Sequence, residues 1–430
     1  MQNKITMRIL PAMVLAAFSG ASAAAGFQLL EQNASGIGNA YAGSAVVAEN
    51  ASTVFFNPAG MTQLQGREMS LGIAAVRPNF DFTNTSSANP PAATGTNDNG
   101  GGDFVAIPNA YVSMPLAKDL YLGVGLGAPF GLVTEYDDTW VGRFQATKFE
   151  VKTINLNPSL AFRVNEQVSV GGGINYQKLE ATYERFAAVG VPPFTNAALN
   201  AAAQNTKVQF KADDTTWGWN LGATFQAGPA TRLGISYRSR MEYTLEGSLN
   251  STNQAISPNV GASADIELPD TWILSAMHKL NDRLDLLADV SWTGWSSIQK
   301  VNIVRTTGAQ AGSTAQTLDA NFQDSWRVAL GANYGWNEAW KLKLGIAYDQ
   351  TPVNSDAERL VSLPDNDRLW LTLGTQWKAA PGSVVDLGLA YLQVKDTKID
   401  NNQTALGRGR VTGEYDSDVL ILGAQYTTAF

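Results

Sequence analysis

Apolar and polar side chains alternate with a period of two residues along most of the chain. In the segment 341–349, one face carries Leu342, Leu344, Ile346 and Tyr348, and the other face carries Lys341, Lys343, Gly345, Ala347 and Asp349. The segments 284–292 and 327–334 alternate in the same way. A period of two with one apolar face predicts a half-buried β-strand. Because a soluble β-sandwich shows the same alternation, this pattern by itself predicts only an all-β fold.

Three further features favour a barrel that spans a membrane. Many segments are long enough to cross the hydrocarbon core as tilted strands of ~9–11 residues. Short and long connections alternate, as periplasmic turns and outer loops do in outer-membrane barrels. Aromatic residues near segment ends resemble the girdle of such barrels, namely Tyr136, Trp140, Trp217, Trp219, Trp292, Trp295, Trp336 and Trp340. Predicted strands begin near residues 67, 107, 120, 148, 167, 207, 231, 264, 283, 321, 340, 367, 383 and 410. We therefore predict a fourteen-stranded antiparallel transmembrane β-barrel, with the even strand number expected of a bacterial single-chain barrel.

The N-terminal part of the chain does not follow the strand pattern. Residues 1–24 have the charged start, the short apolar run and the small-residue cleavage site of a signal peptide. Residues 25–66 are rich in Gly, Ala, Ser and Asn and lack a lasting period, so we expect them to form a hatch inside the barrel of residues 67–430. The hatch ends near Asn57, Pro58 and Ala59, where the proline forces the chain to bend.

Composition narrows the class of protein. The chain has 430 residues, a net charge of -8 and no cysteine, which excludes disulfides and thiolate sites and argues against a nucleic-acid partner. The single histidine, His278, makes a Ser-His-Asp arrangement or a histidine metal site improbable. We expect no enzyme activity, no metal and no cofactor. A terminal Phe430 on an alternating strand fits recognition by the barrel insertion machinery. We therefore expect an outer-membrane location in a Gram-negative bacterium, with outer-membrane lipids, including lipopolysaccharide, around the barrel.

The third predicted strand contains an interruption. Pro129, Phe130 and Gly131 lie in its middle. Proline cannot donate a hydrogen bond to a strand ladder, and glycine often marks a bulge or bend. We expect this strand to kink inward and to leave a gap in the barrel wall. The alternative is a strand that merely curves with the barrel.

Several motifs resemble the FadL family of outer-membrane long-chain fatty acid transporters. They are the segments 25–29, 35–43, 57–59, 130–136, 184–186, 326–331 and 363–370, which run from Ala25-Gly26-Phe27-Gln28-Leu29 to Leu363-Pro364-Asp365-Asn366-Asp367-Arg368-Leu369-Trp370. The resemblance covers nearly the whole mature chain. It implies passive, ligand-gated uptake of long-chain fatty acids with lateral exit through the barrel wall. Relatives that import aromatic hydrocarbons make uptake of such compounds the first alternative, and a structural barrel or adhesin is the distant one.

The resemblance also implies roles for single residues. It places Phe27 near the ligand and gives Arg185 a contact with the ligand carboxylate, for which a guanidinium is well suited. The alternative for Arg185 is an ion pair with a wall carboxylate such as Asp349. In the family, the counterpart of Asp349 helps to keep the hatch closed near the kinked strand. A second cation of the family is not retained, since Leu318 or Asp319 occupies its region, and this raises the odds of a less polar ligand.

Overall fold

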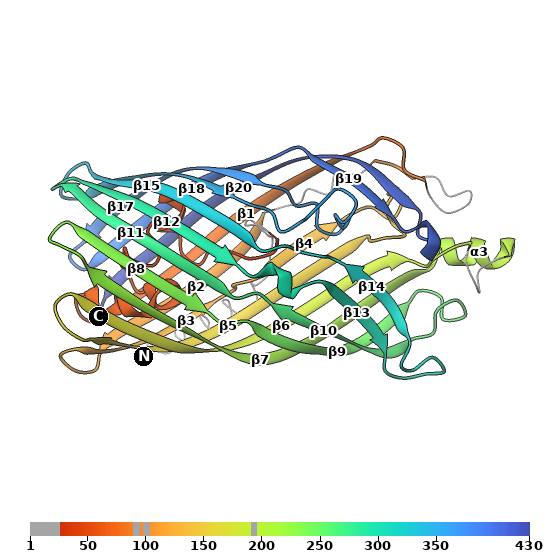
Figure 1. Cartoon of the computed structure of the whole chain (residues 1–430), viewed down its shortest axis with the longest axis horizontal. Helices are drawn as coiled ribbons and strands as arrows, with labels where there is room; N and C mark the ends of the chain where they lie inside the picture. The colour runs from red at the N-terminus through yellow and green to blue at the C-terminus, as the bar shows by residue number, and fades with distance from the viewer. Residues whose placement is uncertain (1–25, 89–94, 98–103, 191–195) are drawn as a thin grey trace, which may run out of the picture.

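The computed structural model describes residues 26–88, 95–97, 104–190 and 196–430, so the predicted signal peptide 1–24 lies outside the described residues. Within these ranges, antiparallel strands form one closed sheet that winds into an elongated barrel (Figure 1). The alternation of the sequence separates the two faces of the wall. Leu344 and Ile346 are 55% and 45% exposed on the outside, whereas Lys343 between them is buried in the lumen. An apolar outside and a polar inside are typical of a membrane barrel.

Eight strands of the described chain are continuous: β1 (Glu68–Asn84), β2 (Val105–Pro115), β5 (Lys148–Arg163), β6 (Val168–Phe186), β7 (Lys207–Gln226), β16 (Trp340–Asp349), β17 (Arg368–Ala380) and β20 (Arg410–Ala429). Six more are each divided into two segments: β3 (Leu120–Gly127) and β4 (Gly131–Glu135), β8 (Thr231–Arg238) and β9 (Met241–Ser251), β11 (Thr271–Asn281) and β10 (Val260–Leu268), β12 (Leu284–Thr293) and β13 (Lys300–Arg305), β15 (Ser325–Gly335) and β14 (Thr314–Asp319), and β18 (Ser383–Val394) and β19 (Thr397–Asn402).

The twenty segments of the described residues therefore make fourteen strands, as predicted. The barrel closes where β1 pairs with β20 in continuous register from Glu68↔Ala429 to Asn84↔Gly413. The short turns lie at the end of the barrel where the N and C labels stand in Figure 1, which is the periplasmic end by the usual pattern of such barrels.

Most of the strand interruptions lie at one level of the barrel. Four neighbouring segments on the periplasmic side, β8, β11, β12 and β15, have their interrupted ends at the same height. Their terminal residues pair with one another in the order Arg238↔Thr271↔Thr293↔Ser325. Above this level, the lumen is lined mainly by a large apolar cluster of buried side chains. Below it lies the N-terminal segment with a second apolar cluster. The barrel is thus divided into an apolar extracellular half and a periplasmic half that holds the hatch.

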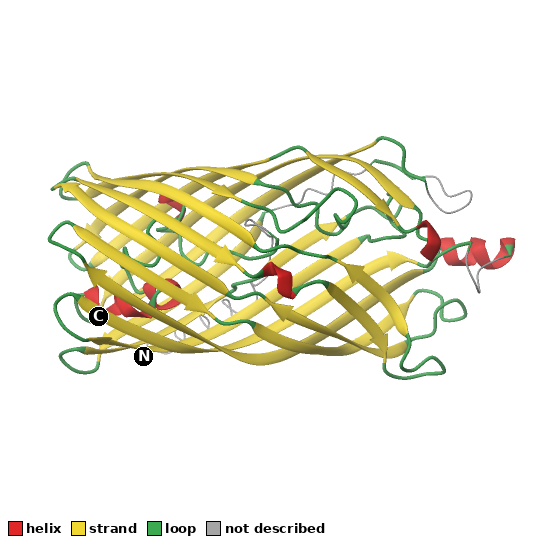
Figure 2. Ribbon diagram, in the orientation of Figure 1, coloured by secondary structure: helices red, strands yellow, loops and turns green. Residues whose placement is uncertain are grey.

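The hatch consists of short helical turns inside the periplasmic half, drawn in red in Figure 2. They are η1 (Ile37–Asn39), α2 (Thr53–Phe56) and η2 (Pro58–Gln63). Gly38 packs so closely on β17 that an added Cβ atom would lie 2.7 Å from the Cα atom of Gly374. Small residues on both sides therefore let the hatch backbone touch the wall.

The remaining helical elements are α3 (Ala197–Gln204) at the extracellular end, η3 (Trp295–Ser297) within a strand interruption, and η4 (Thr404–Leu406). Among the described residues, no helix is long and apolar enough to cross a bilayer.

The predicted aromatic girdle is correct for only part of its members. Trp217, Trp219, Trp336 and Trp340 are 40–66% exposed on the outside of the barrel. Three others point inward and are buried, namely Tyr136, Trp140 and Trp295. Trp295 lies where β12 breaks, and the loss of strand geometry there releases its ring from the outward face. These aromatic residues belong to the lumen and not to the girdle.

Candidate ligand route through the barrel

The tip of the hatch pairs with the kink in the third strand. Residues 128–130 leave strand geometry between β3 and β4, and β4 pairs with β5 but has no register with β2. In place of β2, the hatch supplies a short antiparallel partner. The Leu29 N–H donates to the Pro129 carbonyl at 2.8 Å, and the Gly131 N–H donates to the Phe27 carbonyl at 2.9 Å. The tip therefore covers the edge of the wall that the kink leaves without a strand partner.

Aromatic rings surround Phe27 at this point. Its ring centroid lies 4.9 Å from that of Trp295 and 6.0 Å from that of Phe130. The Trp295 ring in turn lies 6.0 Å from that of Phe322. Edge-on pairs at such distances contribute ~0.5–1.5 kcal/mol each beyond the area they bury. Phe27 thus joins the hatch tip, the kink and the wall opposite in one cluster.

Polar contacts hold the first residues of the hatch. The Gly26 N–H donates to Asp365 Oδ2 at 3.0 Å, and Thr351 Oγ1 donates to the same oxygen at 2.6 Å. Asp365 also forms an ion pair with Arg368. The carboxylate that receives the start of the described chain is therefore Asp365. The family resemblance implies a closing role for Asp349 and none for Asp365.

Asp349 occupies the centre of a charged row across three strands. It is the register partner of Arg327 on β15 and of Arg368 on β17, and all three residues are buried. Arg327 also donates through Nη2 to the carbonyl of Ala40 in the hatch, at 2.7 Å. The row places Asp349 next to the cavity at the kink, where Pro129 and Phe130 also lie. That Asp349 helps to keep the hatch closed stays a prediction.

Glu31 of the hatch lies near the same charged row. It is fully buried, and its two carboxylate oxygens have no hydrogen-bond partner among the described residues. Burial raises the pKa of Glu31 to about 7, although Arg327 and Arg368 act in the opposite direction. We therefore expect protonation of this carboxyl to favour the closed position of the hatch tip.

Arg185 lies at the extracellular end of β6, far along the strand from the hatch. Its Nε donates to Gln316 Oε1 at 2.9 Å, and its Nη1 donates to the Phe186 carbonyl at 2.7 Å. Among the described residues it has no carboxylate partner, so the expected alternative of an ion pair with Asp349 does not occur. The charges of two further arginines, Arg408 and Arg305, interact with that of Arg185. Arg408 is 7% exposed, and its buried Nε has no hydrogen-bond partner in the part of the chain that the structure describes.

The region where the family has its second cation is occupied differently. Leu318 is buried in the apolar cluster of the upper lumen, and Asp319 forms an exposed ion pair with Lys300 at 3.0 Å. Neither residue offers a cation to a ligand. Arg408, between β19 and β20, was missed in the sequence analysis because nothing in the linear pattern brings residue 408 near residue 185.

The segment Asn57-Pro58-Ala59 fixes the second half of the hatch to the wall. Asn57 is fully buried, and its Nδ2 donates to the carbonyls of Ala45, Ala223 and Ile235 at 2.7–3.3 Å. Its Oδ1 accepts from the Ala59 N–H at 3.1 Å and thereby caps η2, which begins at Pro58. One asparagine therefore joins the hatch to two wall strands and ends the bend that the proline imposes.

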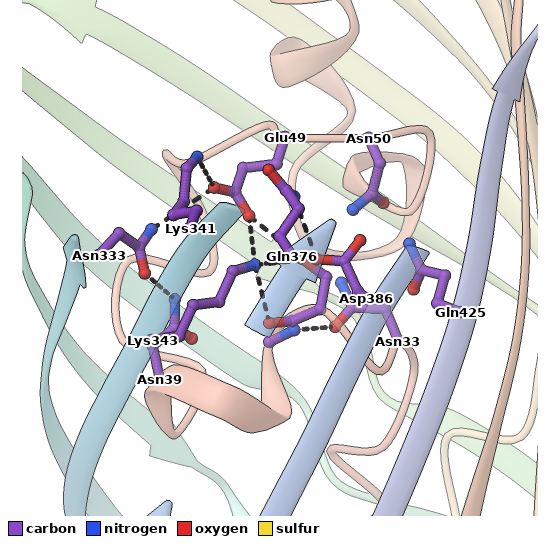
Figure 3. Close-up of polar contacts among 12 residues, drawn as sticks. Asn33, Asn39, Glu49, Asn50, Asn333, Lys341, Lys343, Gln376, Asp386 and Gln425 are labelled. Carbon is purple, nitrogen blue, oxygen red and sulfur yellow. Dashed lines mark hydrogen bonds and ion pairs between the residues drawn. The ribbon is translucent and has the colours of Figure 1, made fainter. Parts of the chain in front are cut away.

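The base of the hatch is held by ion pairs, shown in Figure 3, that join Glu49 of the hatch to β16 and β16 to β18. Lys343 Nζ lies 2.6 Å from Glu49 Oε2 and 3.2 Å from Asp386 Oδ1, and it donates to Ser35 Oγ at 2.8 Å. Lys341 Nζ lies 2.8 Å from Glu49 Oε1. Burial alone would raise the pKa of Glu49, but the two lysines hold it below its ordinary value. We call Ser35, Glu49, Lys341, Lys343 and Asp386 the base anchor.

A barrel with a sealed axis, an apolar upper lumen and an interrupted wall defines an outer-membrane carrier of apolar compounds. The profile of the family "Outer membrane protein transport protein (OMPP1/FadL/TodX)" matches residues 15–430. The chain belongs to this family and is an outer-membrane transporter of hydrophobic compounds, not an enzyme.

Individual relatives cover almost the whole chain. Outer membrane protein P1 of Haemophilus influenzae is 34% identical over 99% of this chain and 96% of its own. The long-chain fatty acid transport protein of Escherichia coli O6:H1 is 28% identical over 97% of both chains. The crystal structure of a FadL homologue from Pseudomonas aeruginosa is 25% identical, with a TM-score of 0.83 over 94% of this chain and 99% of that one. The toluene transporter TbuX of Ralstonia pickettii, at 19% identity and a TM-score of 0.67, shares the fold over 93% of this chain and 99% of its own.

Proposed function

We propose that this transporter imports long-chain fatty acids by passive, ligand-gated diffusion and releases them sideways through the wall at the kink. The observation that carries the proposal is the pair of cations at the top of an apolar lumen. Arg185 and Arg408 lie close enough to interact, and Arg185 has no carboxylate partner among the described residues. Like charges held close together in an apolar lumen are costly, and a carboxylate head group would relieve this cost.

The apolar cluster below these arginines suits the tail of such a ligand. It extends from Tyr183, next to Arg185, to Phe27 and Phe130 at the kink. Transfer of a sixteen-carbon chain from water gains about 12 kcal/mol at ~0.8 kcal/mol per carbon. A charged hydrogen bond contributes ~1.5–3 kcal/mol. The tail therefore supplies most of the affinity, while the head group sets the orientation.

The exit at the kink follows from how unequally the hatch is held. At the tip, two backbone hydrogen bonds link Phe27 and Leu29 to residues 129–131. At the base, Lys343 and Asp386 are ionised groups with side chains no more than 2% exposed. Each of these backbone hydrogen bonds costs less to break than a buried ion pair does. A bound ligand that displaced Phe27 would expose the edge of β4 and open the wall to the membrane.

The test compares two ligands that differ only in the head group. Purified protein is titrated with a sixteen-carbon fatty acid and with the alcohol of the same length. Arg185→Gln and Arg408→Gln should each weaken binding of the acid by ~1.5–3 kcal/mol and leave the alcohol nearly unchanged. Arg410→Gln, which removes an exposed ion pair with Asp400, serves as the control. Equal losses for acid and alcohol would show that the arginines support the barrel and not the head group.

Uptake of aromatic hydrocarbons is the competing function, and the rings around Phe27 favour it. A neutral aromatic hydrocarbon has no charged group that could pair with Arg185 or Arg408. If toluene bound more tightly than the fatty acid, and if both arginine variants transported it at the normal rate, the hydrocarbon function would replace the fatty acid function.

A further inference from the structure

A cavity of about 50 Å³ lies beneath the hatch tip, at the level of the strand interruptions. This volume suits a few water molecules or one small polar group, and not the tail of a ligand. One wall of the cavity is apolar and contains Phe55 of the hatch together with Pro129 and Phe130 of the kink. The opposite wall carries the hydroxyl groups of Thr271, Ser291 and Ser325. The cavity is therefore amphipathic, and its apolar side is the side of the wall opening.

Two arginines face this cavity. Arg238 donates to the Phe55 carbonyl at 2.9 Å and to Asn175, and its guanidinium lies 4.1 Å from the centre of the Phe55 ring. Among the described residues, Arg238 has no ion-pair partner. Arg327 is 6% exposed, and its buried Nε has no hydrogen-bond partner within the described ranges. Both guanidinium groups thus have capacity for an anion.

The acidic group on the cavity wall is Asp349. It lies in register between Arg327 and Arg368, so two arginines share its charge. Arg368 also pairs with Asp365, which lies outside this cavity. The charged residues that line the cavity are therefore Arg238, Arg327 and Asp349, with a positive excess of one charge. A carboxylate here would meet the guanidinium groups of Arg238 and Arg327, and it would share Arg327 with the nearby carboxyl groups of Glu31 and Asp289.

We propose that this cavity is a second carboxylate site, which the fatty acid head group occupies between Arg185 and the wall opening. The proposal rests on the proposed function. A carboxylate that leaves Arg185 must cross an apolar lumen, and an unpaired charge is expensive there. Arg238 and Arg327 offer the head group a new partner at the level of the kink. The tail can then enter the membrane past Pro129 while the head remains paired.

The site can become accessible through a small movement of the hatch tip. Gln28 lines the cavity and bridges its hydroxyl wall, donating through Nε2 to Thr271 at 3.2 Å and accepting from Thr293 at 3.3 Å. These neutral hydrogen bonds are long and therefore weak. An incoming carboxylate could replace the amide of Gln28 on the same hydroxyl groups.

The experiment measures transfer of a fatty acid into liposomes through reconstituted full-length protein. Arg238→Gln should slow transfer of a sixteen-carbon acid about tenfold or more, as expected for a lost charged hydrogen bond, without slowing the alcohol of the same length. Arg238→Lys should restore part of the rate. Arg232→Gln is the matched control, because Arg232 lies on the same face of β8 and also donates to the hatch, at the Val46 carbonyl. It should change neither rate.

Occupancy of the cavity can be measured directly by cysteine labelling, because the chain has no cysteine of its own. Ser291→Cys introduces one thiol at the cavity wall, and a soluble maleimide reports how accessible it is. The fatty acid should slow this labelling and the alcohol should not. Unchanged acid transfer in a folded Arg238→Gln barrel, or equal protection by acid and alcohol, would overturn the second site. If the unmodified protein transferred no fatty acid, the proposed function itself would fail.

Discussion

From the contacts of the base anchor, we predict that Lys343 is required to keep the base of the hatch attached to the barrel wall. Its ammonium group is 1% exposed and lies between Glu49 and Asp386, which are 13% and 2% exposed. Lys343→Met would leave these two carboxylates without their shared cation. Breaking a buried ion pair in this way costs about 3–5 kcal/mol. At ~1.4 kcal/mol per factor of ten, the population of a detached hatch base should rise at least about 100-fold.

Hydrogen exchange measured by mass spectrometry in detergent micelles is the direct assay. Peptides that cover residues 33–50 should exchange much faster in Lys343→Met than in the unmodified protein, while peptides from β6 and β7 keep their rates. Lys341→Met is the matched control. This variant removes the other lysine that pairs with Glu49. Because the Lys341 side chain is 31% exposed, the loss of stabilising free energy should stay below about 1 kcal/mol.

A second variant separates charge from packing. Adding Glu49→Gln and Asp386→Asn to Lys343→Met removes the stranded charges and should recover much of the protection, since replacing a whole buried ionic group is often close to neutral. The reasoning would be refuted if Lys343→Met exchanged like the unmodified protein, or if Lys341→Met had the same effect.

Three further predictions concern the hatch tip, the wall and the topology. Because burial raises the pKa of Glu31 to about 7, the closed tip is fully stabilised below its ordinary pKa of 4.5 and loses this stabilisation as the pH rises through 7. Exchange near residue 31, corrected for intrinsic rates, should therefore be faster at pH 8 than at pH 5, and Glu31→Gln should abolish the difference. Gly131→Val should allow insertion and ligand binding but stop uptake, because a β-branched residue favours regular strand geometry at the kink; normal uptake would count against the lateral route. A tag at Asn402 should be labelled on intact cells and a tag at residue 381 should not, and labelling of both would contradict the orientation.

Strand number and strand facing could be predicted because the membrane imposes them on every strand. Lipid on one side and a polar lumen on the other produce the alternation of Leu344 and Lys343, which can be read without any partner. The kink was equally local, since Pro129 interrupts its own strand. The other divided strands carry no such marker, and Trp295 was therefore assigned to the girdle although it turns inward.

Pairings across the barrel could not be predicted, because they join residues that lie far apart in the sequence. Asp365 receives the Gly26 N–H across 339 positions. Arg408 and Arg185 meet in space for the same kind of reason. The position of Lys343 could be predicted in part, since the alternation of segment 341–349 places this lysine on the lumen face. Its partner Glu49, in a segment without periodicity, could not be chosen from the other acids.

The unequal attachment of the hatch explains how one plug can both seal the barrel and let an apolar ligand leave. A hatch that detached as a whole would open an axial channel and force the ligand tail into water, which loses ~0.8 kcal/mol per carbon. The base anchor around Lys343 opposes this. The tip is different, because the main-chain hydrogen bonds of Phe27 and Leu29 imitate a strand and can be given up one at a time. Each contributes about 0.5–1.5 kcal/mol, less than the binding of a long tail can supply. Under the proposed lateral exit, ligand binding would move the tip while the base stays in place, and the resulting opening would lead into the membrane.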